Sequence, residues 1–299
     1  MQACVRSALR TVRTKSMPVR SRSSSSRSTR KNFAWLPSDH ESHIRAGVLS
    51  AADVKCGGRS WKRIGRLHVL SEDGFETGTK MGLQTGMKMY NSQLSPFAAR
   101  CRIAIYAKDL DVELIDLPDP AHEEAFGRIA PMRKIPVLVD GETVIPESET
   151  ICEYLEDRGL GPSLRPDDPA VCAKMRLIAR ISDLYVMDPM GELFGQINPA
   201  GRDPQLVARE LAALHKAMAW LEHYLEGPEY AVGGRLTLAD CELVPVLFFF
   251  REIGPMFGQA RPFQDLPRIE AYYASIGRHP AAARVLGELD EALKRMTGG

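Results

Sequence analysis

A proline, a short apolar run, a tight turn and an acid–hydroxyl pair constrain the fold of this chain more than any other segment. The run at 135–138 begins with Ile135-Pro136, and a second β-branched run follows at 143–145. Asp140-Gly141 between them supplies the positive φ that a tight hairpin needs, so we expect two antiparallel strands. Because proline has no N–H, Pro136 fits the start of a strand rather than its centre.

A ligand site is expected where this hairpin meets the next helix. If the Ile135-Pro136 peptide bond is cis, the Ile135 N–H and C=O are free to bind an extended peptide. Glu147 and Ser148 then open a helical pattern, with Pro146 expected in its first turn. Free N–H groups at a helix start attract a carboxylate, and an acid binds an ammonium, which together describe an amino-acid end. Alternatively, the pair only caps the helix.

The order and spacing of these motifs resemble those of the glutathione transferases, from about residue 87 to residue 296. The resemblance implies an α/β plus all-α fold, with a thioredoxin-like N-terminal domain followed by a helical-bundle C-terminal domain. In that family, the segment before a cis-proline binds the cysteinyl backbone of glutathione, and an acid-Ser pair binds its γ-glutamyl end. These roles would fall on Ile135-Pro136 and Glu147-Ser148, with glutathione as co-substrate.

Ser95 and Pro96 open another predicted helix, which has Cys101 on its apolar face. Ser-Pro is an ordinary helix start, so a capping role alone explains it. A hydroxyl there can also stabilise a thiolate: lowering a thiol pKa by about two units takes about 2.7 kcal/mol, the order of one charge-assisted bond plus the helix dipole. Ser95 follows Tyr90 at the spacing of the catalytic serine in serine-type relatives, such as the theta and zeta classes.

Tyr90 is a second candidate for the thiolate donor, as in the tyrosine-type classes. It lies in a predicted strand at 87–91 and is followed by a longer loop, so Ser95 is favoured. Ser92 is a weaker candidate. Omega-type relatives have cysteine at the helix start, and serine there disfavours thiol–disulfide reductase activity. Cys101 is expected only to pack in the core.

A basic pair lies just before Ile135. The segment 130–136 is close to the Asn-Pro-x-x-x-x-Pro pattern of zeta and theta relatives, with Ala130 in place of the usual Asn. It follows a strand predicted at 112–116 and a short helix at 123–129. The resemblance places Arg133 and Lys134 near the glycine carboxylate of glutathione. A solvated basic pair is an equal alternative, and Lys134 is favoured because it adjoins Ile135.

The second half of the chain is predicted to be helical. A Gly- and Pro-rich linker at 159–169 separates a thioredoxin-like glutathione-binding domain over 85–160 from a helical domain over 168–297. An apolar stripe from Val207 to Leu225 predicts a core helix. Thr237 and Asp240 form a capping box, whose expected role is folding rather than catalysis.

A hydrophobic co-substrate pocket is expected between the two domains. A helix predicted at 171–196 offers Tyr185, Met187, Met190 and Phe194 to it, although core or dimer contacts explain these side chains equally well. The resemblance also implies a homodimer, which no residue pattern in the sequence indicates by itself.

The first 84 residues are predicted to be a disordered basic extension. Residues 1–80 hold sixteen basic and six acidic side chains, or +10, whereas residues 81–299 hold twenty-three and thirty-two, or −9. Three alternatives remain open: an overextended reading frame with the true start at Met81, Met87 or Met89, a targeting or regulatory arm, and a nucleic-acid-binding arm.

The remaining composition narrows the class of protein. No apolar run reaches the roughly 20 residues of a membrane span, no Cys-x-x-Cys pair occurs, and the seven histidines are scattered. We therefore expect a cytoplasmic protein without metal, membrane or nucleic-acid partners. The resemblance implies a detoxification enzyme that transfers the glutathione thiolate to a hydrophobic electrophile. The alternatives are a glutathione-dependent isomerase or dehalogenase like maleylacetoacetate isomerase, and a non-catalytic interaction module.

Overall fold

The structure is a computed structural model of the chain and describes residues 83–117 and 119–298. These residues belong to one compact unit. Apart from residues 83 and 84, the predicted basic extension lies outside the described residues, and so do the three alternatives for its role.

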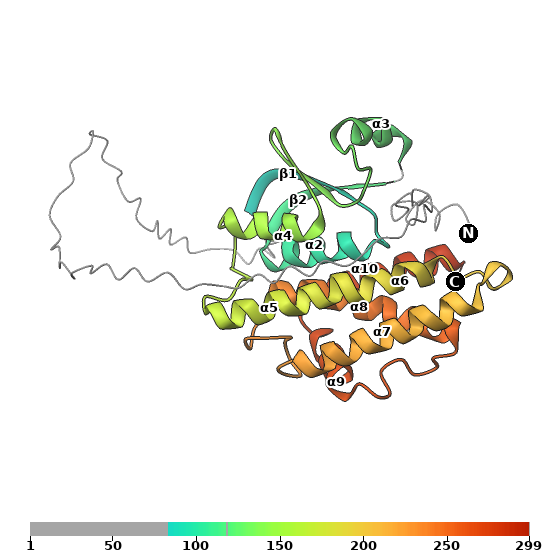
Figure 1. The fold of residues 1–299 in the computed structure, drawn as a ribbon. Coiled ribbons are helices and arrows are strands. Elements are labelled where there is room, and N and C mark those ends of the chain that lie inside the picture. Colours follow the sequence, from blue (N-terminus) through green and yellow to red (C-terminus); the bar gives the residue numbers. More distant parts are fainter. Residues whose placement is uncertain (1–82, 118, 299) are drawn as a thin grey trace, which may run out of the picture. The chain divides into compact units, whose positions relative to one another are not determined.

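The first part of the described chain builds a mixed sheet in the order β2-β1-β3-β4 (Figure 1). Its strands are β1 (Leu83–Asn91), β2 (Leu110–Asp116), β3 (Val137–Asp140) and β4 (Thr143–Pro146). β1 and β2 are parallel, and β3 pairs antiparallel with both β1 and β4. The strands predicted at 87–91 and 112–116 are confirmed. Each begins earlier than predicted, and an irregularity between Gln84 and Met87 shifts their register.

The predicted hairpin is confirmed, and Gly141 turns it with φ of +59°, a conformation that glycine adopts without steric cost. The prediction that Pro146 lies in the first turn of the next helix is wrong. Pro146 ends β4, where it pairs with Val137, and α4 (Ser148–Asp157) begins after it. Because β4 is an edge strand, a proline at its end interrupts no central ladder.

Three helices belong to this part of the chain. α2 (Pro96–Ala107) connects β1 to β2, α3 (Pro120–Ile129) connects β2 to β3, and α4 follows β4. α2 contacts β2 and α4, and it also contacts α8 (Leu238–Ile253) and α10 (Pro280–Thr297). It therefore lies between the sheet and the helices of the second part (Figure 1), which explains why its residues from Ala98 to Ile105 are all buried.

The second part of the chain is helical, as predicted. Before α8 come α5 (Pro169–Ile181), η2 (Ser182–Val186), α6 (Met187–Phe194), η3 (Pro199–Gly201) and α7 (Pro204–Tyr224); η4 (Gly254–Phe257), α9 (Pro267–Ile276) and α10 follow it. The prediction of a single helix at 171–196 is wrong in one respect. This segment is interrupted by η2, a π-helical turn that separates α5 from α6.

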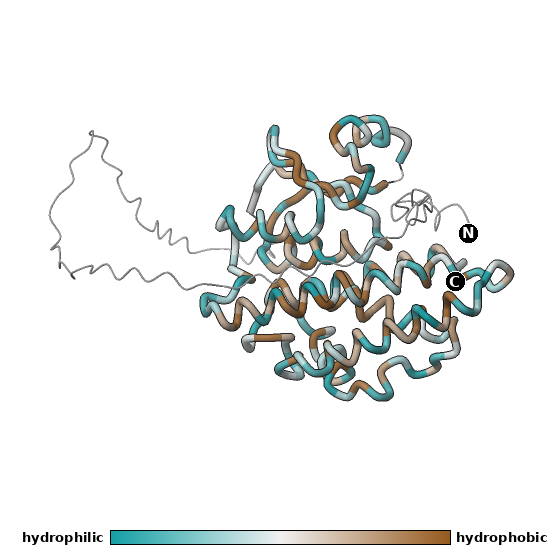
Figure 2. Tube along the Cα trace, in the orientation of Figure 1, coloured by the Kyte–Doolittle hydropathy of each residue, from teal (hydrophilic) through white to brown (hydrophobic). Residues whose placement is uncertain are grey.

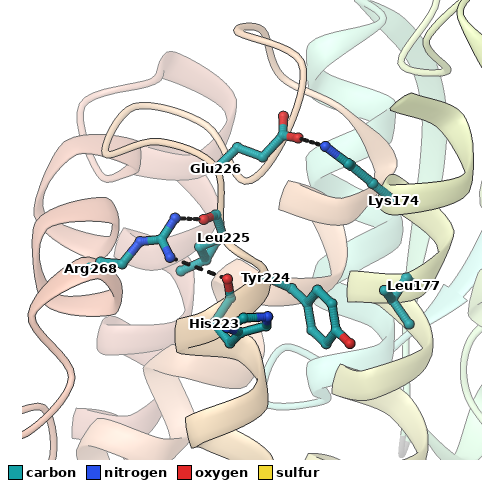
Figure 3. A pocket seen from close by; sticks show the side chains of 7 residues that line it. All are labelled: Lys174, Leu177, His223, Tyr224, Leu225, Glu226 and Arg268. Atoms are coloured by element: carbon teal, nitrogen blue, oxygen red, sulfur yellow. Dashed lines mark hydrogen bonds and ion pairs between the residues drawn. The ribbon is translucent and has the colours of Figure 1, made fainter. Parts of the chain in front are cut away.

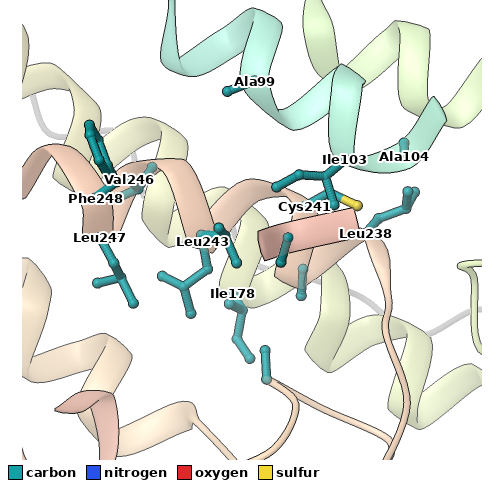
Figure 4. Close-up of a cluster of buried hydrophobic side chains, with 14 of the residues drawn as sticks. Ala99, Ile103, Ala104, Ile178, Leu238, Cys241, Leu243, Val246, Leu247 and Phe248 are labelled. Carbon is teal, nitrogen blue, oxygen red and sulfur yellow. The ribbon is translucent and has the colours of Figure 1, made fainter. Parts of the chain in front are cut away.

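The core centres on α8, which is buried along most of its length. Ile103 of α2 points toward Cys241 and Leu238 of α8 (Figure 4), and all three side chains are buried. Hydrophobic residues also line the strands and α5 (Figure 2). The capping box at the start of α8 is confirmed, because the Thr237 side chain accepts from the Asp240 N–H and the Asp240 carboxylate accepts from the Thr237 N–H at 2.8 Å.

Candidate functional site

The predicted site segments meet at one end of the sheet. Tyr90 of β1 pairs with Val137 of β3, and Val137 pairs with Pro146 of β4. The chain therefore leaves β1, enters β3 and leaves β4 at the same end of the sheet. The segments at this end lead to Ser95, the Ile135-Pro136 bond and the Glu147-Ser148 pair.

Ser95 is the N-cap of α2, as predicted. Its backbone is extended, and its Oγ accepts a hydrogen bond from the N–H of Ala98 at 3.2 Å, with Pro96 as the first helical residue. Since the backbone N–H is the donor in this bond, the Ser95 hydroxyl keeps its own proton to donate elsewhere. The side chain is half-buried, so capping and donation to a ligand are compatible.

The loop before Ser95 is held by a buried arginine that sequence reasoning missed. Arg102 of α2 donates to Asn91 Oδ1 at 2.7 Å and to the carbonyl oxygen of Gln93 at 3.0 Å. Its Nε lies 3.0 Å from Glu288 of α10. Burial lowers the pKa of Arg102, and Glu288 opposes that shift. The helical part of the chain thus supports the loop that carries Ser95.

Two backbone conformations distinguish the other side of the site. The Ile135-Pro136 peptide bond is cis, which was the condition attached to the Ile135 prediction. Glu147 has φ of +69° and ψ of 120° at the start of α4. A positive φ at a residue with a side chain costs on the order of 1–3 kcal/mol, and such residues cluster at functional sites. The Glu147 side chain is exposed, whereas Ser148 is buried.

Ser148 is joined to α2 by a second buried arginine. Arg100 Nη1 donates to Ser148 Oγ at 3.1 Å, and the Arg100 side chain is only 1% exposed. Cys101, the next residue, donates its thiol to the carbonyl oxygen of Ser148 at 3.5 Å and is fully buried, as predicted. α2 therefore contacts the start of α4 through two consecutive side chains.

Two acidic side chains from the helical part pair with Arg100. Its Nη2 lies 3.3 Å from Asp183 Oδ1 of η2 and also forms an ion pair with Glu242 of α8. Burial alone would lower the pKa of Arg100, but Glu242 and Asp183 together raise it. Burial raises the pKa of Glu242 to about 8, and the charge of Arg100 opposes that rise.

Arg133 and Lys134 are not brought into contact with Ser95 or Ser148. Both side chains are exposed. Arg133 has φ of +49°. Its guanidinium lies so close to Gly127 of α3 that a Cβ added at this glycine would be 2.7 Å from the Nη2 of Arg133. Their predicted contact with a glycine carboxylate stays a prediction.

Tyr90 lies on the other face of the sheet from α2. Its ring packs against Phe126 of α3 with a centroid distance of 5.2 Å, in a small cluster that includes Val137. The tyrosine side chain is 8% exposed. This position makes Tyr90 a core residue of the sheet.

The side chains proposed for a co-substrate pocket do not converge. Met187 and Met190 are buried in the core, and Phe194 packs against Phe249. Tyr185 is 49% exposed and contacts Trp220 of α7 edge to face, at 5.2 Å. Tyr185 belongs to the π-helical turn, and the other three belong to α6.

A cavity of about 520 Å³ opens elsewhere, between α5 and α7 (Figure 3). Lys174 and Glu226 form an ion pair at one side of it, and Arg268 donates to backbone carbonyls at the end of α7 on the other. None of the predicted site residues lines it. Its charged side chains are already paired with protein groups.

The two arginines and their acidic partners are the functional candidates that sequence reasoning missed. A signal was present, because Arg100 and Arg102 interrupt an apolar helix run and Glu242 interrupts the apolar run of α8. A charge within such a run predicts a buried, paired group. Which residues pair could not be read, because the partners are far apart in sequence.

Within residues 83–117 and 119–298, no group of three or more His, Cys, Asp or Glu side chains could hold a metal ion. No helix in this described part of the chain is long and apolar enough to cross a membrane.

Comparison with known proteins points to one family. Residues 89–163 match the glutathione S-transferase N-terminal domain, and residues 204–275 match its C-terminal domain. Glutathione S-transferase Z2 of Arabidopsis thaliana is 30% identical over 69% of this chain and 92% of its own length. Maleylacetoacetate isomerase of Mus musculus is 30% identical over 52% of this chain and 74% of its own length.

The fold also matches solved structures. A glutathione S-transferase from Methylobacterium radiotolerans, in complex with glutathione sulfonate, has a TM-score of 0.58 at 24% identity and covers 68% of this chain and 95% of that protein. Together with the mixed sheet and the helices that follow it, this confirms the predicted thioredoxin-like and helical organisation.

Proposed function

This chain belongs to the glutathione S-transferase family, and we propose that Ser95 activates a glutathione thiol bound between α2 and α4. The family assignment makes the protein a glutathione transferase with glutathione as co-substrate. The proposal concerns the serine-type mechanism, the residues that bind each part of the tripeptide, and the reaction.

Ser95 would act by donating its hydroxyl proton in a hydrogen bond to the thiolate. The thiol loses its proton to solvent, and the sulfur then forms a bond to an electrophilic carbon as the leaving group departs with its electron pair. The free hydroxyl proton of Ser95 and the positive end of the α2 dipole both stabilise the anion. The burial of Tyr90 against Phe126 supports Ser95 over Tyr90 as the donor.

The γ-glutamyl end is assigned to the start of α4. Its carboxylate would accept the Ser148 hydroxyl and backbone N–H groups of the first turn, while Glu147 binds its ammonium. The positive φ of Glu147 supports this assignment, because it is a strained conformation kept beside the expected ligand. The cysteinyl backbone is assigned to Ile135 before Pro136, and the glycine carboxylate to Arg133 and Lys134.

One observation carries the proposal: the ladder pairs Tyr90 with Val137 and Val137 with Pro146, so all three binding segments adjoin the sheet at one end. A tripeptide can span from Ser148 past Ile135 toward Ser95 along that end of the sheet. Isothermal titration of the protein with glutathione tests the binding, and thiolate absorbance against pH tests Ser95. Absence of binding contradicts the enzyme proposal, and an unchanged thiol pKa in Ser95→Ala contradicts the role of Ser95.

Conjugation to a hydrophobic electrophile is the favoured reaction, and isomerisation is the second candidate. The similarity to a maleylacetoacetate isomerase supports the second, as the same thiolate can add to a carbon–carbon double bond and leave again. Product analysis separates them: conjugation consumes glutathione, and isomerisation returns it. A protein that binds glutathione but carries out neither reaction would instead fit the interaction module.

We also propose a cytoplasmic homodimer. Large apolar side chains are exposed together on α5, η2 and α7: Leu177, Leu184, Tyr185, Trp220 and Tyr224. Exposed apolar side chains gathered on one surface are typical of protein–protein interfaces. A second copy of this chain is the proposed occupant of this surface, and light scattering after size-exclusion chromatography measures the oligomeric state.

A further inference from the structure

Arg100 determines in which hydrogen bond the Ser148 hydroxyl accepts and in which it can donate. A guanidinium has only hydrogen-bond donors, so in the 3.1 Å contact between Arg100 Nη1 and Ser148 Oγ the serine oxygen must be the acceptor. The serine proton is then left for another acceptor. Among the residues that the structure describes, no acceptor for it is found.

The guanidinium is itself held from several sides. Asp183 accepts from Nη1 and Nη2 at 3.4 and 3.3 Å, Glu242 pairs with Nη2, and the Phe97 ring lies 5.1 Å from the guanidinium carbon. Asp183 belongs to η2 and Glu242 to α8, so both carboxylates come from the helical part of the chain. A planar group fixed at this many points cannot rotate away from Ser148.

We propose that Arg100 is a positioning residue, held by Asp183 and Glu242, that directs the Ser148 hydroxyl proton toward the α-carboxylate of the γ-glutamyl end of glutathione. The inference rests on the proposed function, because it assumes that this end binds at the start of α4. It adds that the helical domain controls the affinity of the site through one arginine. Arg100 itself need not touch the ligand.

Binding of two ligands tests the inference. One is glutathione, and the other is 4-aminobutyryl-cysteinylglycine, which lacks only the α-carboxylate of the γ-glutamyl residue. In Arg100→Lys a single ammonium replaces the planar fork, so the donor to Ser148 is lost or moved. We expect the Kd for glutathione to rise about tenfold and the Kd for the analogue to change less than about twofold, by isothermal titration calorimetry.

A double-mutant cycle identifies the route of the effect. Ser148→Ala should weaken glutathione binding by about the same factor as Arg100→Lys, and adding Arg100→Lys to Ser148→Ala should change the Kd less than about twofold. A further tenfold loss in the Ser148→Ala background would mean that Arg100 acts by a route other than the Ser148 hydroxyl, and it overturns the inference.

Two further variants distinguish an effect on binding from a folding defect. Arg100→Met combined with Glu242→Met removes both buried charges and leaves only the partly exposed Asp183 without its partner. It should discriminate between the ligands as poorly as Arg100→Lys. Lys108→Arg changes another buried cation, which lies just after the same helix, pairs with Glu156 and does not contact Ser148, so the ratio of the two Kd values should stay as in the wild type. Equal losses for both ligands in the Arg100 variants would indicate a purely structural role and overturn the inference. A wild-type protein that does not bind glutathione refutes the proposed function instead.

Discussion

Lys108 Nζ lies 2.7 Å from Glu156 Oε1, and the two side chains are only 1% and 3% exposed. The ammonium also donates to the carbonyl oxygens of Leu160 and Pro162, both at 2.9 Å. Glu156 in turn accepts from the N–H of Leu164 at 3.0 Å. The pair therefore joins the residue after α2 to the end of α4 and to the segment predicted as a linker, which is fixed rather than free.

Removing one partner of this pair should be costly. We expect Lys108→Met to lower the free energy of unfolding by about 3–5 kcal/mol, because it leaves Glu156 buried without its counter-charge. Lys108→Met with Glu156→Met should recover part of that loss, because no buried charge remains unpaired, although the carbonyls of Leu160 and Pro162 still lose their donor. The exposed pair Lys88–Glu113 is the control, and Lys88→Met should cost less than about 1 kcal/mol. Urea denaturation measures all of these; equal losses in the single and double variants would contradict the expectation.

Two glycines in the same segment give a matched steric test. Gly159 and Gly161 have φ of +62° and +64°, so alanine at either position costs about 1–2 kcal/mol of backbone strain. A Cβ at Gly161 would also lie 2.2 Å from the carbonyl oxygen of Lys108, whereas none lies within 4 Å at Gly159. Gly161→Ala should therefore be the more destabilising by at least about 1 kcal/mol in urea denaturation. Similar midpoints would show that the backbone moves to make room.

Ser95 variants should separate capping from thiolate stabilisation. Ser95→Ala removes both and should raise the pKa of bound glutathione toward about 8.5, with a stability loss of about 1 kcal/mol. Ser95→Asp keeps a good N-cap, so stability should be retained. Its negative charge should still raise the thiol pKa, because it repels the thiolate. Thiolate absorbance against pH gives the pKa; a wild-type value in Ser95→Asp would rule out Ser95 as the donor.

Glu242 should make stability depend on pH. Burial raises its pKa to about 8, from 4.5 for an ordinary glutamate. A carboxyl with a raised native pKa stabilises the fold fully below about pH 4.5, and this contribution is lost as the pH rises through about 8. Between pH 6 and 8, wild-type protein should lose about 2 kcal/mol relative to Glu242→Gln.

The control for this comparison is Glu252→Gln, at a partly exposed position of the same helix. Its stability profile should run parallel to that of the wild type. If the Glu242→Gln profile is parallel as well, the charge of Arg100 keeps Glu242 ionised throughout this pH range.

The proposed dimer predicts a change in molar mass. Trp220→Glu places a charge in the exposed apolar surface of α5, η2 and α7, and we expect it to convert the dimer to monomer at micromolar concentration. Met256→Glu, at a 42% exposed position of η4 outside that surface, should leave the dimer intact. Light scattering measures the molar mass of both variants, and a monomeric wild type contradicts the proposal.

Local signals in the sequence predicted the local structure. The Ser95-Pro96 helix start, the turn at Gly141 and the capping box of Thr237 and Asp240 each depend on a few neighbouring residues, and each is confirmed. Pro146 was misplaced because its pairing with Val137 decides its strand conformation. Adjacent residues alone favour a helix start there equally well.

Long-range partners and a change of helical period explain what could not be predicted. Arg100 meets Glu242 across more than one hundred residues, and nothing in either segment identifies the other. Tyr185 and Met187 were both offered to one predicted pocket, but Tyr185 of the π-helical turn is exposed and Met187 of α6 is buried. The roles of Ile135, Arg133 and Lys134 toward a ligand stay predictions.

The π-helical turn at Ser182–Val186 also has a consequence for how this protein tolerates insertions and deletions. Such a turn holds one residue more than an α-helical turn, and each α-helical residue rotates the chain by about 100°. Loss of a single residue here would join α5 and α6 into one regular helix and rotate every side chain of one half relative to the other. Asp183 would then leave Arg100, or Met187 and Met190 would leave the core. A protein of this fold with a continuous helix at this position must therefore either pair the arginine with another group or pack the residues of α6 differently.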